Sequence, residues 1–79
     1  MSTEDYVNDP LWPVLVETVH AMVLYPHHKA YVKRVILLER PDITYRDLAM
    51  FMGLAVGEAM IILHELRVEA ARSKPESDK

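Results

Sequence analysis

Five basic side chains concentrated in the middle of the chain have the clearest chemical potential in this sequence. Residues 27–46 contain five lysines and arginines against two acidic residues, whereas residues 1–26 contain four acidic residues and no lysine or arginine. Ammonium and guanidinium groups gathered in this way are suited to phosphate oxygens, and such contacts bind DNA without reading its sequence. A solvated helix face beside acidic neighbours would give the same pattern, and that interpretation is the more common one. The candidate phosphate contacts are Lys29, Lys33, Arg34, Arg40 and Arg46.

The residues that metal sites and enzymes use form no recognisable arrangement. His27 and His28 are adjacent and cannot share a helix face, while His20 and His64 have no partner at the spacing of helical metal ligands. Only two glycines occur in the chain, which is too few for a glycine-rich phosphate loop. The sequence therefore predicts no catalytic residues, no metal and no cofactor, and a protein that is not an enzyme.

Length and composition restrict the class of protein. Seventy-nine residues allow one small domain, and a hydrophobic content of 51% is enough to form its core. There is no cysteine, so the sequence offers neither disulfides nor thiolate metal ligands. The apolar run over residues 11–25 is interrupted by Glu17, Thr18 and His20, and it is too short and too polar for a bilayer core of about 30 Å. We expect a cytoplasmic protein that does not enter membranes.

The elements that must position these residues are helical. Residues 1–8 are polar and without periodicity, so we expect them to be disordered. Asp9 and Pro10 are typical of a helix start, and Pro26 ends the apolar helical pattern that follows. A second helix is predicted over residues 28–40, where Pro41 and Asp42 break the pattern.

Two further helices are predicted in the C-terminal half. Thr44 is suited to the cap of a short helix, and Asp47 stands where a capping box places its acidic residue. Gly53 can adopt the left-handed conformation that ends this helix. A last helix should run from about residue 56 to about residue 73, followed by a charged, disordered tail at 74–79. The domain predicted from the sequence is therefore all-α, spans residues 9–73 and contains about four helices.

Residues 43–66 resemble the helix-turn-helix superfamily. Such a unit needs a small residue where its two short helices cross and a glycine at the turn, and Ala49 and Gly53 occupy these positions. An ordinary pair of antiparallel helices is the alternative. The chain ends without the strands of a wing, so the resemblance is to a wingless helix-turn-helix over residues 44–66. Apolar residues hold the two helices together in this superfamily, and here they are Leu48, Met52, Leu54, Ala59 and Ile62.

The second helix of this motif carries few groups that could read bases. Direct readout of DNA needs hydrogen-bond donors and acceptors, but among the positions that resemblance assigns to readout only Glu58 and His64 have polar side chains. A helix that is apolar beyond one face is typical of one buried on more than one side. Either a partner protein or the first helix of the chain would cover it. The candidate protein interface consists of Val56, Met60, Ile61, His64 and Val68.

Two functions follow from these patterns. The resemblance implies a small DNA-associated transcriptional regulator, in which phosphate contacts dominate and the fourth helix does not read bases. The residues of that helix favour a protein-interaction module, either a homodimer or an accessory subunit, that does not bind DNA. The expected partners are accordingly double-stranded DNA, a second copy of the chain, or another protein.

Overall fold

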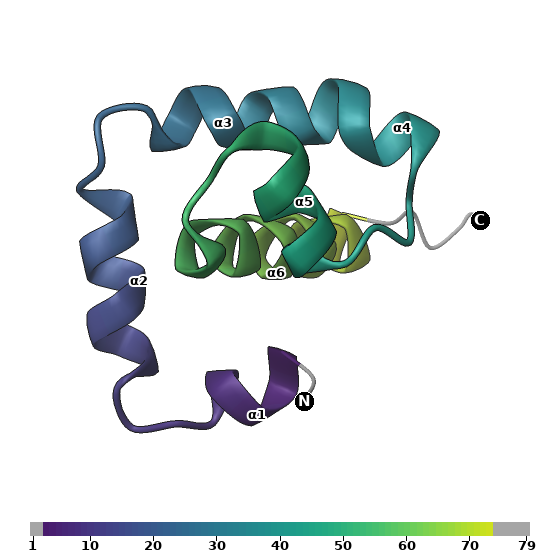
Figure 1. The fold of residues 1–79 in the computed structure, drawn as a ribbon. Helices are drawn as coiled ribbons and strands as arrows, with labels where there is room; N and C mark the ends of the chain where they lie inside the picture. The colour runs from purple at the N-terminus through teal and green to yellow at the C-terminus, as the bar shows by residue number, and fades with distance from the viewer. Residues whose placement is uncertain (1–2, 74–79) are drawn as a thin grey trace.

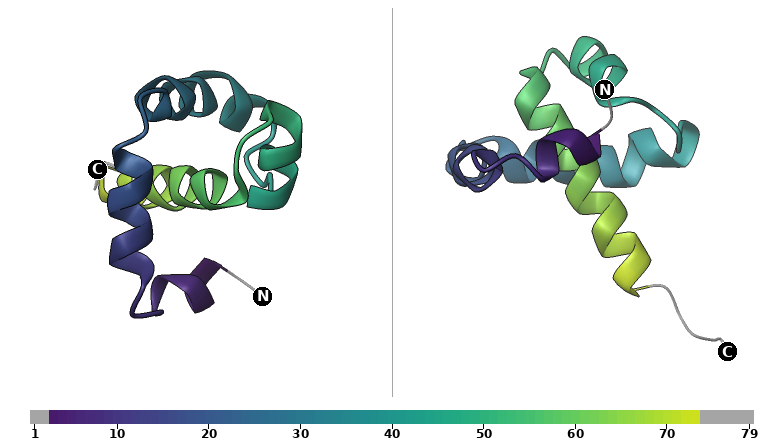
Figure 2. Two further views of the ribbon diagram at one scale, coloured as in Figure 1. Left: turned by 60° about the vertical axis from the view of Figure 1, so that its left-hand side comes forward. Right: turned by 90° about the horizontal axis from the view of Figure 1, so that it is seen from below.

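The chain folds into an array of helices around one central helix. The computed structural model describes residues 3–73, and every regular element within this range is helical. In chain order they are α1 (Thr3–Val7), α2 (Trp12–His20), α3 (Tyr25–Tyr31), the π-helical turn η1 (Val32–Ile36), α4 (Leu37–Glu39), α5 (Tyr45–Met52) and α6 (Val56–Ser73). Figures 1 and 2 together show α3 to α4 as one continuous rod that crosses α6, with α5 packed on α6 to one side and α2 standing at the α3 end of the rod. The predicted all-α class is confirmed.

Helix α6 is the centre of the fold. It contacts α2, α3 and α5, and six consecutive residues, 58–63, are each at most 5% exposed. Since a helical turn takes 3.6 residues, six buried residues in a row mean that α6 is covered on all sides over this stretch. The C-terminal end of α6 projects beyond the other helices (Figure 2). The core cluster around α6 includes Val19, Val32, Ile36, Ile43 and Leu48 from the other segments.

The rod formed by α3, η1 and α4 contains a wide turn. The Leu37 N–H donates to the carbonyl of Val32, five residues back, as in a π-helix. Val32 and Ile36 are fully or nearly buried on its inner side, and Leu37 packs against the core. Leu38, which helical periodicity places on the inner face, is 80% exposed. The extra residue in the turn explains the difference, because it rotates the positions that follow.

Helix α5 begins and ends as its sequence predicts. The Thr44 side chain accepts a hydrogen bond from the Asp47 N–H, and Gly53 ends the helix in the left-handed region at φ 70°. Ala49 is buried where α5 meets α6, and the bounds of both helices agree with the prediction. The segment before α5 is fixed by Arg67 of α6, whose guanidinium donates to the carbonyls of Pro41 and Ile43 at 3.0 and 2.9 Å.

Helices α1 and α2 form an N-terminal arm that wraps around α6. The ring of Tyr6 in α1 meets that of Tyr45 in α5 edge-on, with centroids 6.5 Å apart. Helix α2 then crosses α6, and the turn at residues 21–24 leads into α3 (Figure 1). We refer to residues 3–20 as the arm.

The N-terminal half differs from the prediction in four places, two of which are helix starts: α2 begins at Trp12 and not at Asp9–Pro10, and α3 begins at Tyr25, with Pro26 in its first turn, and not at residue 28. Residues 3–7 form the short helix α1, although disorder was predicted for residues 1–8. The first long helix ends at His20 instead of continuing to Pro26, because residues 21–24 turn so that α2 and α3 can both pack on α6. The predicted tail at 74–79 lies outside the described residues. Within the described range, no helix combines the length and the apolar character needed to cross a membrane.

Candidate functional site

The face of α6 that would enter a DNA groove in a helix-turn-helix protein is covered by α2. A methyl group placed on Gly57 would lie 3.3 Å from Cδ1 of Leu15, so the two helices approach closely at this glycine. Two turns further along α6 the contact continues, where the ring of Trp12 meets that of His64 edge-on at 5.5 Å between centroids. The arm therefore occupies the surface that base readout would need.

This packing corrects part of the predicted protein interface. Met60 and Ile61 are 5% and 0% exposed, so both belong to the interior of the chain and are not available to a partner. The physical reason is the position of α6, which has neighbours on every side at this level. His64 and Val68 are half-buried beside a groove, and Val56 is 47% exposed at the start of α6. Only Val56 of the predicted set is an open surface position.

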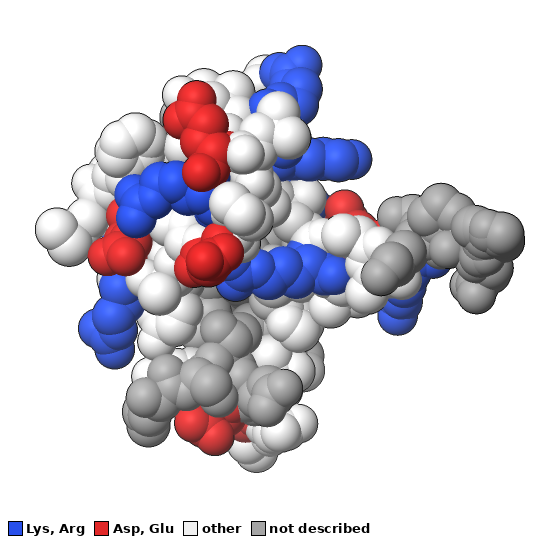
Figure 3. All heavy atoms as spheres, turned by 90° about the vertical axis from the view of Figure 1, so that its right-hand side faces the viewer, with Lys and Arg blue, Asp and Glu red and all other residues white. Residues whose placement is uncertain are grey.

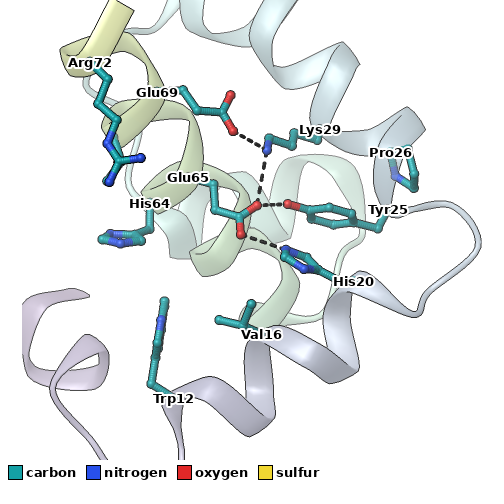
Figure 4. Close-up of a pocket in the computed structure, with 11 residues that line it drawn as sticks. Trp12, Val16, His20, Tyr25, Pro26, Lys29, His64, Glu65, Glu69 and Arg72 are labelled. Carbon is teal, nitrogen blue, oxygen red and sulfur yellow. Dashed lines mark hydrogen bonds and ion pairs between the residues drawn. The ribbon is translucent and has the colours of Figure 1, made fainter.

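A groove of about 670 Å³ lies where α2, α3 and α6 meet, and Glu65 organises its polar wall. One carboxylate oxygen of Glu65 accepts hydrogen bonds from the Tyr25 hydroxyl and from Lys29 Nζ, and the other is 2.7 Å from Nε2 of His20. Lys29 also donates to Glu69 at 2.6 Å. Figure 4 shows these side chains pointing toward one another from three helical segments. We call Tyr25, Lys29, His20, Glu65 and Glu69 the Glu65 cluster.

Burial and hydrogen bonding within the Glu65 cluster lower the pKa of Glu65 and raise the pKa values of Tyr25 and Lys29. Burial alone would raise the pKa of the Glu65 carboxyl, but hydrogen bonds from Tyr25, His20 and Lys29 outweigh burial and lower it. Burial, followed by the hydrogen bond to Glu65, raises the pKa of the Tyr25 hydroxyl far above its ordinary value. The pKa of Lys29 is raised by Glu69 and Glu65 despite the opposing effect of burial. The cluster is therefore a hydrogen-bonded set of polar groups, with Lys29 and Glu65 in their charged forms, that joins α2 and α3 to α6.

A second polar pair lies inside the fold. The carboxylate of Glu58 is 2% exposed, and one of its oxygens is 2.7 Å from Nδ1 of His28 on α3. Glu58 lies in the first turn of α6, among the positions at which a helix-turn-helix protein would contact bases, yet its side chain points into the protein. Its role is to join α3 to α6, because a buried carboxylate needs a hydrogen-bond partner.

The five candidate phosphate contacts have different environments. Lys29 is engaged in the Glu65 cluster and is only partly accessible. Arg40 lies 3.9 Å from Asp47, and the guanidinium of Arg46 stacks at 5.5 Å from the ring centroid of Tyr45. Lys33 and Arg34 are exposed on η1. On the face around α4 and the end of α6, basic groups are separated by acidic and uncharged ones (Figure 3).

An exposed apolar patch flanks the turn between α5 and α6. Met50 and Phe51, at the end of α5, are 83% and 64% exposed, and Val56 follows at the start of α6. We call these three residues the α5 patch. Large apolar side chains exposed within a short stretch of chain are typical of sites where another protein binds. Since the inner side of α5 already packs on α6, the α5 patch is available to a partner.

No model of a protein family, no curated protein and no solved structure matches this chain. The interpretation of its surface therefore rests on the geometry alone.

The Glu65 cluster was not predicted from the sequence, because His20, Tyr25 and Lys29 are 36 to 45 residues from Glu65 and no local pattern joins them to it. Glu58 could have been found, because it is the only charged residue between Asp47 and His64. An isolated acidic residue in such an apolar stretch indicates a buried, paired carboxylate. The exposure of Phe51 is less strongly indicated by the sequence. Helical periodicity places Phe51 beside Asp47, and a charged residue marks the outer side of α5.

Proposed function

We propose that this protein is a protein-interaction module built on a helix-turn-helix-like frame, and that it binds an apolar surface of a partner protein through the α5 patch. The observation that carries the proposal is the burial of residues 58–63 of α6. A recognition helix needs one open face to enter the major groove. In this chain that face is occupied by the arm, so the second helix of the motif serves as a core element.

The α5 patch is the surface that remains for recognition. Its two largest side chains, Met50 and Phe51, leave most of their area in water, which is unfavourable unless a partner removes that area from solvent. Methionine and phenylalanine are also suited to binding, because one is adaptable and the other contributes a large rigid contact area. Arg46 and Asp47 lie one turn earlier on the same side and could form a polar rim.

Site-specific photocrosslinking in cells tests this proposal. A photoreactive residue at position 51 should capture a partner that is not captured from position 38, where Leu38 is as exposed but belongs to α4. The purified partner, which could be another protein or a second copy, should then bind the wild-type chain and the Leu38→Glu variant. Binding should be lost in Met50→Glu/Phe51→Glu. Identical capture from positions 51 and 38, or binding that survives the double substitution, would contradict the proposal.

A second candidate function is supported by the exposed basic residues. Lys33, Arg34 and Arg46 have accessible side chains, so a DNA-associated regulator could bind phosphates through them without using α6. This function predicts duplex binding that weakens steeply with salt and that is reduced by Lys33→Glu/Arg46→Glu. Binding to duplex DNA should be measured at two salt concentrations, with Arg72→Glu, at the far end of α6, as the matched control. No binding at low salt would exclude this candidate.

A further inference from the structure

We propose that the arm exchanges between two copies of the chain, so that α2 of one copy docks on α6 of the other. The surface that α2 covers is apolar at Gly57, which Leu15 contacts, and polar at His64 and Glu65, which Trp12 and His20 contact. A second copy carries the identical arm and can therefore make the same contacts, which makes exchange an accessible route to a dimer. The partner of this surface is thus a second copy, and no new complementarity is needed.

The hinge for the exchange is the turn at residues 21–24. It is closed by a hydrogen bond from the Tyr25 N–H to the Met22 carbonyl at 3.1 Å. Leu24 has φ −89° and ψ −2°, which are the values of the third residue of a type I turn, and Ala21 also lies in the right-handed helical region. Since Ala21 and Leu24 already have helical backbone angles, a change confined to residues 22 and 23 would join α2 to the start of α3 and swing the arm away from its own α6.

Side-chain exposure at the hinge supports this conformational change. Met22, Val23 and Leu24 are consecutive apolar residues that are 38%, 88% and 56% exposed. In an exchanged dimer the two hinges cross beside each other at the two-fold axis, where these side chains can cover one another. The closed chain gives them no such cover. Residues 21–25 contain no glycine or proline and continue the helical pattern of α2, and Pro26 is the residue that opposes a continuous helix in the open form.

Two substitutions should shift the exchange in opposite directions. Val23 is the second residue of the turn, where proline is favoured, and within the described residues its N–H donates no hydrogen bond. Val23→Pro should therefore hold the closed turn and raise the dimer dissociation constant roughly tenfold, because each dimer contains two hinges. Pro26→Ala removes the ring that opposes a continuous helix and should lower that constant by a similar factor.

Sedimentation of the full chain over a range of concentrations gives the dimer constant, and engineered cysteines identify the exchange. The chain has no cysteine of its own. Chains carrying Leu15→Cys, mixed with chains carrying Gly57→Cys, should form a disulfide between the two variants. Val14→Cys should not form it with Gly57→Cys, because Val14 is exposed on the outer side of α2.

Three results would overturn the inference. They are a wild-type chain that stays monomeric at every concentration, a dimer that neither hinge substitution changes, and crosslinks that Val14→Cys forms as readily as Leu15→Cys. The inference is separate from the proposed function, because Met50→Glu/Phe51→Glu should remove partner binding at the α5 patch and leave the exchange intact. Failure of one proposal is therefore distinguishable from failure of the other.

Discussion

The Glu65 carboxylate accepts hydrogen bonds from donors on two of the helices that pack against α6, namely α2 and α3. His20 ends α2, whereas Tyr25 and Lys29 lie one turn apart on α3. A single acidic residue thus links both sides of the turn at 21–24 to the central helix. At the scale of residues, the stability of the fold depends on the ionisation of this group.

We expect the stabilisation by Glu65 to disappear in acid. The pKa of Glu65 is lowered in the folded chain, so its contribution is complete above the unfolded pKa, about 4.3, and is lost as the pH falls through the folded pKa. Glu65→Gln should therefore be less stable than the wild type at pH 7, and the difference should shrink toward pH 3. Urea denaturation at several pH values measures this. Glu17→Gln on the exposed side of α2 is the control, and a difference that stays constant with pH would show that Glu65 acts by packing alone.

Removing one partner of the buried pair formed by Glu58 and His28 should cost more stability than removing both. His28→Ala leaves a carboxylate inside the protein without its partner, which should lower the free energy of unfolding by about 2 to 3 kcal/mol. The double variant His28→Leu/Glu58→Leu should recover most of that loss, because two apolar groups replace both partners. His27→Ala, at the neighbouring exposed position, serves as the control in urea denaturation. A double variant no more stable than His28→Ala would contradict this account.

At the scale of elements, the turn between α5 and α6 depends on one left-handed residue. Gly53 has φ 70° and open space around it, so a side chain there is opposed by backbone strain and not by a clash. Gly53→Ala should lower the free energy of unfolding by about 1 to 2 kcal/mol. Gly53→Asn should lose less, because asparagine tolerates this conformation better. Thermal denaturation compares the two, and equal losses would contradict the strain argument.

The ends of the helices show which features of the fold could be predicted from the sequence. The ends of α5 and α6 follow from local chemistry at Thr44 and Gly53, and both were predicted correctly. The end of α2 was placed too late, because residues 21–24 favour a helix locally and turn only when the arm docks. The Glu65 cluster and the burial of Met60 and Ile61 depend on contacts between distant segments, which periodicity cannot locate.

At the scale of the whole molecule, the arm is a separate layer laid over the α3–α6 unit. Leu15→Ala should weaken its docking without disturbing the contact between α5 and α6. Hydrogen exchange of α2 amides should rise about tenfold, since removal of a packed leucine side chain destabilises by more than ~1.4 kcal/mol. Exchange in α5 should not change. Leu11→Ala, where the side chain is 69% exposed, is the control, and a uniform rise across all helices would show that the arm and the unit unfold together.

The wide turn at Val32–Ile36 makes this part of the chain tolerant of a one-residue deletion. A π-turn contains one residue more than the α-helix it interrupts, and removal of that residue restores the ordinary helical path. If Arg34 were deleted, the helices on either side would keep their present faces toward α6, because the wide turn already absorbs the extra residue. Tyr25 and Lys29 would still face Glu65, and His28 would still face Glu58. A deletion at this exposed position would therefore leave both polar links between α3 and the central helix in place, whereas a deletion within an ordinary α-helix turns the residues on its two sides by about 100° relative to each other.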